Sequence, residues 1–325
     1  MVGQQTSDAD RSSLQEISLD AEGNTFELRQ KSCPTCNISD QRVLGYRGGR
    51  WHRYGLGLAT RIVQCKQCRL IFPNPFPYPR NPQTLYGDPA KYFESHDAHT
   101  SECSRTTGCR KLIRQIAQLA KKTPLSILDV GSGRGELLKA ARLEGMCDVV
   151  GLEFAQAMID YVQSRYGITL VPQTIEQYAA STTRTFDAIV LNAVLEHVCD
   201  PDSMIRACAK LARPGSVLYI DVPNEPNLLT VVGNTLNRIR GHRAVFNLSP
   251  TWIPYHVFGF NPHALRILLK KYGFEIMHIR TFATPAVPSR PDLGDRLKAF
   301  IGTQLNRLAN VTGTASNMYV WARRI

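Results

Sequence analysis

The sequence predicts an α/β protein with a mostly parallel sheet, helices on both sheet faces and a small cysteine-containing module in front. Three observations support this prediction. Strand and helix signals alternate from residue 126 onward, which is the pattern of a parallel sheet built from βα units. A glycine-rich turn follows the first of these strands, and two Cys-x-x-Cys pairs precede the whole region.

The elements follow from apolar periodicity and from proline and glycine boundaries. A helix is expected over residues 110–122, ending before Pro124. Strands are expected at 126–130, 148–153, 168–171 (a short third strand), 186–191, 216–222, 274–282 and 317–325, and helices at 135–145, 155–167, 201–212, 263–273 and 292–308.

Composition narrows the class of protein. The chain has 325 residues, 43% of them apolar, with no apolar run near the ~20 residues that a membrane span requires. Its start is polar and acidic, unlike a secretory signal, so we expect a cytoplasmic protein without a membrane span. The formal net charge of +12 suits attraction to phosphates, nucleic acid or an anionic membrane surface, although the basic residues are scattered.

The chain divides into three expected regions. Residues 1–28 are polar and aperiodic, which predicts a disordered tail. Residues 29–80 hold both cysteine pairs and end in a proline-dense stretch. Residues 81–325 carry the βα units, with an irregular insertion near 226–255 that we expect to form a cap beside the active site.

The cysteine pairs predict a metal site. Cys33 and Cys36 form the first pair, and Cys65 and Cys68 the second. Four thiolates at such spacing surround Zn²⁺ tetrahedrally in structural sites, and a reducing compartment favours metal over disulfides. Asn37 and Arg69 stand where such knuckles often carry glycine. We therefore expect a zinc ribbon with an enlarged hairpin between the pairs.

The glycine-rich turn indicates a nucleoside site on a Rossmann-like sheet. In Ile127–Glu136, ILDVGSGRGE, glycines alternate with other residues between a strand and a helix, where a Cβ would block a ligand. The third glycine comes one residue earlier than in the dinucleotide fingerprint GxGxxG, which argues against a nicotinamide-dependent dehydrogenase. Glu153 ends the second strand, where an acid binds ribose hydroxyls.

These motifs resemble those of class I S-adenosylmethionine (SAM)-dependent methyltransferases. LDVGSGRG is similar to the first motif of that superfamily, FDAIVLNAVLEHVCDP to its fourth-strand motif, and LARPGSVLYIDVPN to its fifth, in the same order. The resemblance covers roughly residues 110–282. It implies a seven-stranded sheet whose last strand is antiparallel, and an enzyme that uses SAM.

Carried over residue by residue, the resemblance implies a set of cofactor contacts. The methionine part of SAM is expected near the glycine turn, the ribose at Glu153, the adenine at the loop after the third strand, and a further contact at the end of the fourth strand. The implied cofactor-binding residues are Asp129, Gly131, Ser132, Gly133, Gly135, Glu153, Phe154, Thr174, Ile175 and Asn192.

The module and domain together resemble bacterial zinc-ribbon methyltransferases, a group that includes sugar C-methyltransferases. Members of that sugar group carry a further C-terminal domain, which does not follow within these 325 residues. We therefore expect a small molecule or a glycan as acceptor, with the methyl group going to a hydroxyl or a carbon.

Three residues are candidates for acid–base chemistry. Glu196 and His197 follow the fourth strand, on the edge where parallel sheets bind ligands. His256 ends the insertion, and the zinc-ribbon relatives carry a histidine near the sugar at the matching place. An imidazole accepts a proton near neutral pH. Structural roles for both histidines are equally consistent with the sequence.

Two other functions fit part of the pattern. An RNA methyltransferase that grips RNA through its zinc ribbon would use the positive charge, although Asn192-Ala193-Val194-Leu195 lacks the Pro-Pro-aromatic segment of base amino-group methyltransferases. A zinc-ribbon binding protein with an inactive methyltransferase domain is the non-catalytic alternative. The intact glycines and Glu153 argue against it.

Overall fold

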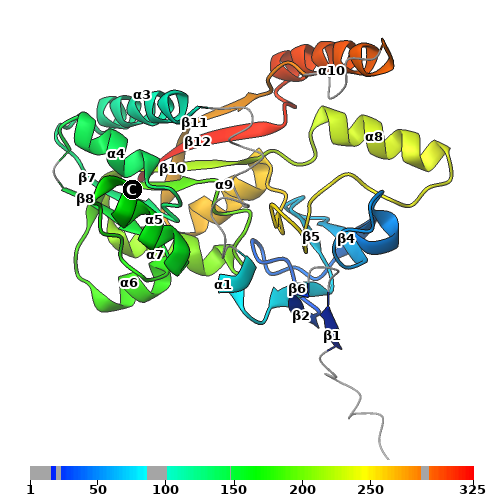
Figure 1. Ribbon diagram of the computed structural model, residues 1–325, viewed down its shortest axis with the longest axis horizontal. Coiled ribbons are helices and arrows are strands. Elements are labelled where there is room, and N and C mark those ends of the chain that lie inside the picture. Colours follow the sequence, from blue (N-terminus) through cyan, green and yellow to red (C-terminus); the bar gives the residue numbers. More distant parts are fainter. Residues whose placement is uncertain (1–15, 20–22, 86–100, 147, 287–292) are drawn as a thin grey trace, which may run out of the picture.

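The computed structural model describes residues 16–19, 23–85, 101–146, 148–286 and 293–325. A six-stranded sheet with its helices forms the larger part, which we call the sheet part (residues 101–223 and 262–325) (Figure 1). Two three-stranded sheets form the N-terminal part (residues 23–79), with Glu16–Leu19 added to one of them. The insertion (residues 224–261) leaves the sheet part and packs on the N-terminal part.

The large sheet has the order β11-β12-β10-β9-β7-β8. The pairs β10–β9, β9–β7 and β7–β8 are parallel, whereas β12 runs antiparallel to both of its neighbours. This arrangement confirms the α/β class and the antiparallel last strand. The strands are β7 (Ser126–Val130), β8 (Asp148–Leu152), β9 (Phe186–Asn192), β10 (Ala212–Pro223), β11 (Phe274–Phe282) and β12 (Asn317–Arg324).

The expected third strand is reduced to one bridge, so the sheet has six strands in the described residues instead of the seven implied by the resemblance. Val171 bridges Leu152 in parallel, and its amide and carbonyl bond with Gly151 and Glu153. The amide that would continue the ladder is that of Gln173, and it bonds back to the Val171 carbonyl instead, so the ladder ends there. The segment still lies where a third strand would lie.

Alternating apolar residues explain why helices cover both faces of the sheet. Ile127, Ala188 and Val190 face a core that contains Ile113 and Ile116 of α3, whereas Leu128 and Ile189 face a core with α7 and α9. Side chains buried on both faces are the mark of a parallel sheet. The helices of the sheet part are α3 (Glu102–Ala120), α4 (Glu136–Leu143), α5 (Gln156–Tyr166), α6 (Ile175–Ser181), α7 (Pro201–Leu211), α9 (Pro262–Lys271) and α10 (Leu293–Thr312).

The N-terminal part is a pair of small antiparallel sheets, β1-β2-β6 and β3-β4-β5. The hairpin of β3 and β4 lies between the two cysteine pairs, as expected for an enlarged ribbon. The remaining short elements are the helical turns η2 (Gly49–Trp51) and α1 (Pro82–Leu85). The strands are β1 (Glu16–Leu19), β2 (Thr25–Arg29), β3 (Gln41–Arg47), β4 (Thr60–Cys65), β5 (Ile71–Pro73) and β6 (Phe76–Pro79).

The prediction of a disordered tail over residues 1–28 is wrong for part of that range. β1 pairs with β2, and β2 pairs with β6 around Phe26, which is buried against Leu85 and Tyr255. Burial of this aromatic ring offsets the entropy of ordering a short polar segment. Residues 1–15 and 20–22 lie outside the described residues.

The insertion is anchored to the N-terminal part by main-chain bridges. Ala244 pairs with Tyr46, Gly259 pairs with Ile71, and Val245 and Leu248 share a small core with Ile62. Before these contacts the insertion forms α8 (Leu228–Ile239), a helix that the sequence analysis did not predict. Asn227 caps α8 by accepting a hydrogen bond from the Thr230 amide.

Candidate functional site

The glycine turn lies at the carboxyl end of β7, where the chain turns into α4. Gly131, Gly133 and Gly135 all have positive φ, between 48° and 71°. A Cβ on Gly131 would stand 2.9 Å from Cγ2 of Val194, and a Cβ on Gly135 would stand 2.9 Å from Cγ1 of Val162. Both the backbone conformation and the close packing therefore require glycine.

Glu153 fastens this turn to the end of β8. One of its carboxylate oxygens accepts a hydrogen bond from the Gly133 amide at 3.1 Å. The other accepts from the Phe154 and Ala155 amides at 2.9 and 3.0 Å. Burial raises the pKa of Glu153, and the three amides oppose that shift. The loop and the acid predicted to share one nucleoside are thus in direct contact.

Asp129 is buried at the end of β7, directly before the glycines. Burial raises the pKa of its carboxyl to about 7, a hydrogen bond with Ser132 opposes the shift, and the charges of Glu153 and Glu136 add to it. A cationic partner would stabilise the ionised form of this carboxyl, because a positive charge would offset the cost of its desolvation. The methionine ammonium group of SAM is such a partner.

The other expected cofactor residues lie at the same edge of the sheet but differ in which of their groups a ligand could contact. Asn192 is exposed at the end of β9, and Phe154 is half-buried after β8. Thr174 caps α6 in a reciprocal capping box with Gln177, so its hydroxyl oxygen already accepts one hydrogen bond from the Gln177 amide. Ile175 is fully buried in the core, which leaves only its backbone for a ligand.

Glu196, His197 and His256 come together although 60 residues separate the first from the last. Nε2 of His197 is 3.6 Å from Oε1 of Glu196, and Nε2 of His256 is 4.0 Å from the same oxygen. The two imidazole rings meet edge-on with their centroids 4.8 Å apart. Ligand atoms from all three lie within 4.8 Å of one another, a spacing that a metal ion could also use.

Main-chain hydrogen bonds explain this convergence. The Glu196 carbonyl accepts from the amides of Val257 and Phe258, the two residues after His256. His197 lies on the turn after β9 that begins at Val194, the residue packed against Gly131. The cluster is therefore adjacent to the glycine turn.

The Glu196 carboxyl is almost completely buried, with 1% of its side chain exposed. Burial raises its pKa well above the usual range, and Asp221 nearby acts in the same direction. A buried carboxyl this close to two imidazoles shares its proton equilibria with them, so the three groups titrate as a unit. The arrangement is suited to proton exchange at the carboxyl edge of the sheet.

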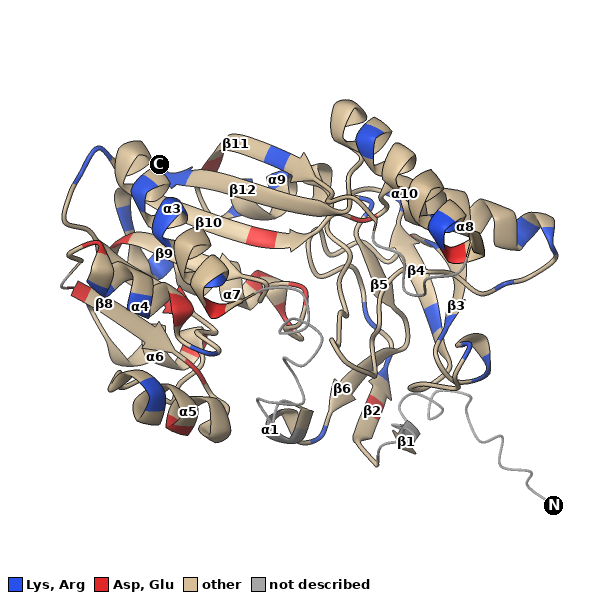
Figure 2. Ribbon diagram, turned by 45° about the horizontal axis from the view of Figure 1, so that its top comes forward, with Lys and Arg blue, Asp and Glu red and all other residues tan. Residues whose placement is uncertain are grey.

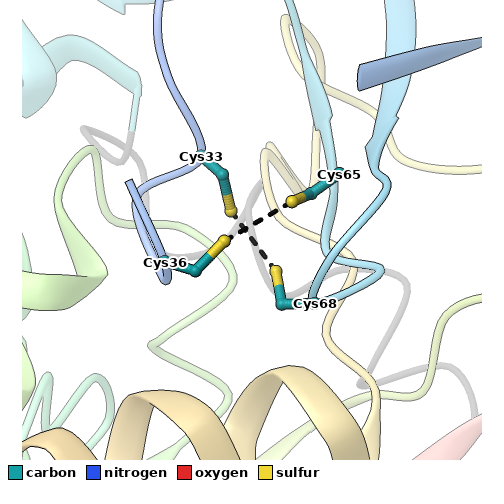
Figure 3. A group of neighbouring side chains, drawn as sticks. All are labelled: Cys33, Cys36, Cys65 and Cys68. Atoms are coloured by element: carbon teal, nitrogen blue, oxygen red, sulfur yellow. Dashed lines mark hydrogen bonds between the residues drawn. The ribbon is translucent and has the colours of Figure 1, made fainter. Parts of the chain in front are cut away.

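The four predicted metal ligands also converge. In Figure 3 the sulfur atoms of Cys33, Cys36, Cys65 and Cys68 point toward one centre. The Sγ atoms of Cys33 and Cys68 are 3.4 Å apart, and those of Cys36 and Cys65 are 3.5 Å apart. A tetrahedral zinc with bonds of about 2.3 Å needs sulfur separations of about 3.8 Å, so the cluster is close to the required size.

Two matching turns build this cluster. The Asn37 amide bonds to the Cys33 carbonyl, and the Arg69 amide bonds to the Cys65 carbonyl. Asn37 and Arg69 have φ of 58° and 64°, the left-handed region in which glycine is the usual residue. The turn geometry of a zinc knuckle is therefore kept despite the departure noted in the sequence.

Comparison with known proteins decides the family. A family described as a methyltransferase domain matches residues 104–279, more than half of the chain. The chain belongs to this methyltransferase family. Its sheet part is a class I SAM-dependent methyltransferase domain, in agreement with the strand order and the glycine turn.

Curated relatives of this methyltransferase include two ubiquinone biosynthesis O-methyltransferases. The protein from Citrobacter koseri is 34% identical over 115 residues, which cover 33% of this chain and 47% of the relative. The protein from Aliivibrio fischeri is also 34% identical over 115 residues, covering 33% and 49%. The methyltransferase thus spans about half the length of the curated relatives it matches.

Solved structures include a SAM-dependent methyltransferase from Archaeoglobus fulgidus, with 19% identity and a TM-score of 0.47, covering 67% of this chain and 94% of that one. The plantazolicin methyltransferase BpumL in complex with SAH has 16% identity and a TM-score of 0.49, covering 75% and 93%.

One acid of the methyltransferase site was missed by sequence reasoning. Asp221 lies near the end of β10, paired with Asn192 on β9 and Tyr319 on β12. Desolvation raises the pKa of its carboxyl to about 7. The available signal was an acid at the end of the apolar strand VLYIDV, at the edge of the sheet that carries the other site residues.

Proposed function

We propose that this methyltransferase moves a methyl group from SAM to a hydroxyl oxygen or a carbon of a small molecule or glycan. The observation that carries the proposal is the cluster of Glu196, His197 and His256 beside the glycine turn. A buried acid and two imidazoles at this edge supply what methylation of a hydroxyl needs from the chain, namely a positioned proton acceptor.

The residues around the glycine turn fit SAM. SAM, when bound, supplies an electrophilic methyl group on its sulfonium. We assign Asp129, Gly131, Ser132, Gly133 and Gly135 to the methionine part and Glu153 to the ribose. The remaining contacts, near the adenine and beside the cofactor, are assigned to Phe154, Thr174, the Ile175 backbone and Asn192.

Within the cluster, we assign His256 as the group that accepts the proton of the acceptor hydroxyl. Its side chain is 28% exposed, against 12% for His197, so it is the imidazole more accessible to an acceptor. Glu196 orients both rings from its buried position. A hydroxyl acceptor is favoured over carbon because the curated relatives named above are O-methyltransferases.

The test begins with cofactor binding. Calorimetric titration of the purified protein with SAM, with NAD as control, should show micromolar binding of SAM alone. Glycans, hydroxylated metabolites and RNA are then screened by mass spectrometry for the gain of one methyl group. A gain only on RNA would replace this proposal with an RNA methyltransferase, and binding of NAD instead of SAM would contradict it.

The proton role is tested on the acceptor found by that screen. Substitutions His256→Ala and His197→Ala are each expected to lower kcat by about 10²- to 10⁴-fold while SAM affinity is retained. The matched control is His278→Ala, because His278 lies on β11 against Trp321, outside the cluster. Full turnover in both cluster variants would rule out the assignment.

We further propose that Cys33, Cys36, Cys65 and Cys68 hold one structural Zn²⁺. Four thiolates from two facing turns leave no position for water, so the ion would cross-link the chain without taking part in methyl transfer. Elemental analysis of protein purified without added metal should give one zinc per chain, and its absence from well-folded protein would contradict this proposal.

A further inference from the structure

The helix α10 has its packing reversed relative to an ordinary surface helix. Its inward side carries small or polar residues, with Ala299, Asn306 and Ala309 buried. Its large apolar side chains are exposed, with exposed fractions from 51% at Ile301 to 86% at Val311. These exposed apolar residues are Leu293, Leu297, Phe300, Ile301, Leu308 and Val311.

The spacing of these residues places them on one stripe. At about 100° per residue, all six fall within an arc of about 100° that lies opposite the buried alanines. Arg296 and Arg307 fall along one edge of this arc, and Asp295 falls on the far side. The helix is thus amphipathic toward the outside, with basic residues beside its apolar stripe.

The neighbouring helix α8 repeats this character. Half of its twelve residues are apolar, yet none of the twelve is buried. Leu229, Val231, Leu236 and Ile239 are among its exposed residues, and Ile239 is 77% exposed. α8 contacts α10, and Figures 1 and 2 place the two helices together at one end of the molecule. We call their exposed apolar residues the α8–α10 surface.

The charge around this surface is almost entirely positive. Residues 226–261 contain no Asp or Glu, and Arg238, Arg240 and Arg243 lie at the end of α8 and just beyond it. Figure 2 shows blue segments on both helices. Arg238, His242 and Arg243 also line a cavity of about 250 Å³ against β3. A partner for this surface must combine apolar area with negative charge.

A second copy of the chain fits this requirement poorly. A two-fold interface would set the surface against itself and bring its arginines together, and like charges across an interface oppose association. The face of an anionic bilayer offers both an apolar layer for the stripe and negative headgroups for the arginines. No helix within the described ranges is long and apolar enough to cross a membrane.

We propose that the α8–α10 surface docks this protein on anionic phospholipid bilayers. The two helices lie in the plane of the bilayer surface, with the apolar stripe of α10 and the exposed apolar residues of α8 at the headgroup boundary. Arg296 and Arg307 bind headgroups beside the stripe of α10, and the cavity lined by Arg238 and Arg243 receives a headgroup at the end of α8.

The experiment is flotation of the full chain with two kinds of vesicle, pure phosphatidylcholine and phosphatidylcholine with about one third phosphatidylglycerol. The wild-type protein should float only with the anionic vesicles and detach at about 1 M salt, where charge attraction is screened within about 3 Å. No flotation with anionic vesicles would overturn the proposal.

Variants locate the binding surface. Leu297→Gln combined with Phe300→Gln should lower the fraction bound at least about tenfold, because two large side chains lose their apolar burial. Arg296→Gln combined with Arg307→Gln should abolish the preference for anionic vesicles. The matched control is Leu143→Gln, an exposed leucine at the end of α4, which should bind as the wild type does.

Two results would contradict the assignment. If the double variant of α10 floated like the wild type, the surface would play no part in binding. If the wild type sedimented as a dimer that the same variant dissociated, the surface would be an interface between copies. SAM titration of each variant checks that the sheet part is folded, since α10 carries none of the residues assigned to SAM.

Discussion

The sheet part and the N-terminal part of this methyltransferase differ in how far apart along the chain their contacting residues lie. In the sheet part, β7, α4 and β8 follow one another in sequence and pack as neighbours. In the N-terminal part, Tyr46 pairs with Ala244 and Ile71 with Gly259, partners nearly 200 residues away. Long loops make such contacts costly to form. A region built this way depends on cross-links, which the cysteine cluster and the insertion supply.

The strongest test of this contrast is to remove the proposed zinc. Cys65→Ser should lower the free energy of unfolding by at least about 3 kcal/mol, because a structural site contributes directly to folding. Limited proteolysis should then cut within residues 30–79, while SAM affinity changes by less than about threefold. The matched control is Cys103→Ser, an exposed cysteine outside the cluster. Loss of SAM binding with zinc would show that the two parts are not separable.

A second test acts on the sheet part alone. Glu153→Ala should weaken SAM binding by about 1–3 kcal/mol, because hydrogen bonds to the ribose are lost and the Gly133 amide loses its acceptor. Zinc content should be unchanged. Glu275→Ala, an exposed acid on β11, serves as the control in the same titration. Unaltered SAM affinity in the Glu153 variant would remove Glu153 from the cofactor site.

A third test concerns Glu225, which lies in the insertion near the charge of Arg47 on the N-terminal part. Its carboxylate accepts hydrogen bonds from Asn247 of the insertion and Thr230 of α8, and burial raises its pKa from 4.5 to about 7. A carboxyl with a raised pKa binds its proton more tightly in the folded state. Its contribution to stability is therefore present below pH 4.5 and lost as the pH rises through about 7.

Substitution Glu225→Gln should remove this pH dependence. Relative to wild type, the variant should gain about 2–3 kcal/mol of stability between pH 5 and pH 8, as measured by chemical denaturation across that range. The pKa of Asp187 is lowered by Lys122 and Ser126, so its contribution to stability is lost as the pH falls and does not mimic the effect of Glu225. Parallel stability curves for variant and wild type would contradict the assignment.

The smallest effect is expected at the cysteine turns. Arg69→Gly should stabilise the N-terminal part by about 0.5–1 kcal/mol, because Arg69 has a φ of 64° that glycine adopts without strain. Asn37→Gly should give less, since asparagine tolerates this conformation. Thermal denaturation of zinc-loaded protein measures both. Destabilisation at Arg69 would mean that its side chain has a role that outweighs the strain.

The predictions from sequence succeeded where the signal is local. Gly131, Gly133 and Gly135 follow β7 and Glu153 follows β8, the next strand, so the sequence alone placed them on neighbouring strand ends, and the structure joins them through the Gly133 amide. The two cysteine pairs indicated a shared site because each pair lies on one short turn that supplies two of the four thiolates. The parallel strands followed from apolar residues on both faces of the sheet.

Other features depend on long-range contacts that no local pattern records. Glu196 and His256 were each selected as candidates, but their meeting depends on the bonds from Val257 and Phe258 to the Glu196 carbonyl, which span about 60 residues. The ordered strand around Phe26 depends on β6 and on Tyr255. The periodicity of α10 predicted a helix, but whether its apolar stripe faces inward or outward depends on what packs behind it.

The double hydrogen bond at the Glu196 carbonyl has a consequence for how the family can vary. Since one peptide group holds the start of the 257–261 segment, the position of His256 is set by its immediate neighbours. The insertion also holds His256, because the His256 amide donates to the Ser249 hydroxyl and the Ser249 amide donates to the His256 carbonyl. Only the part of the insertion before Ser249, including α8, is free to change in length without displacing the imidazole. A longer or shorter α8 would therefore leave His256 beside Glu196.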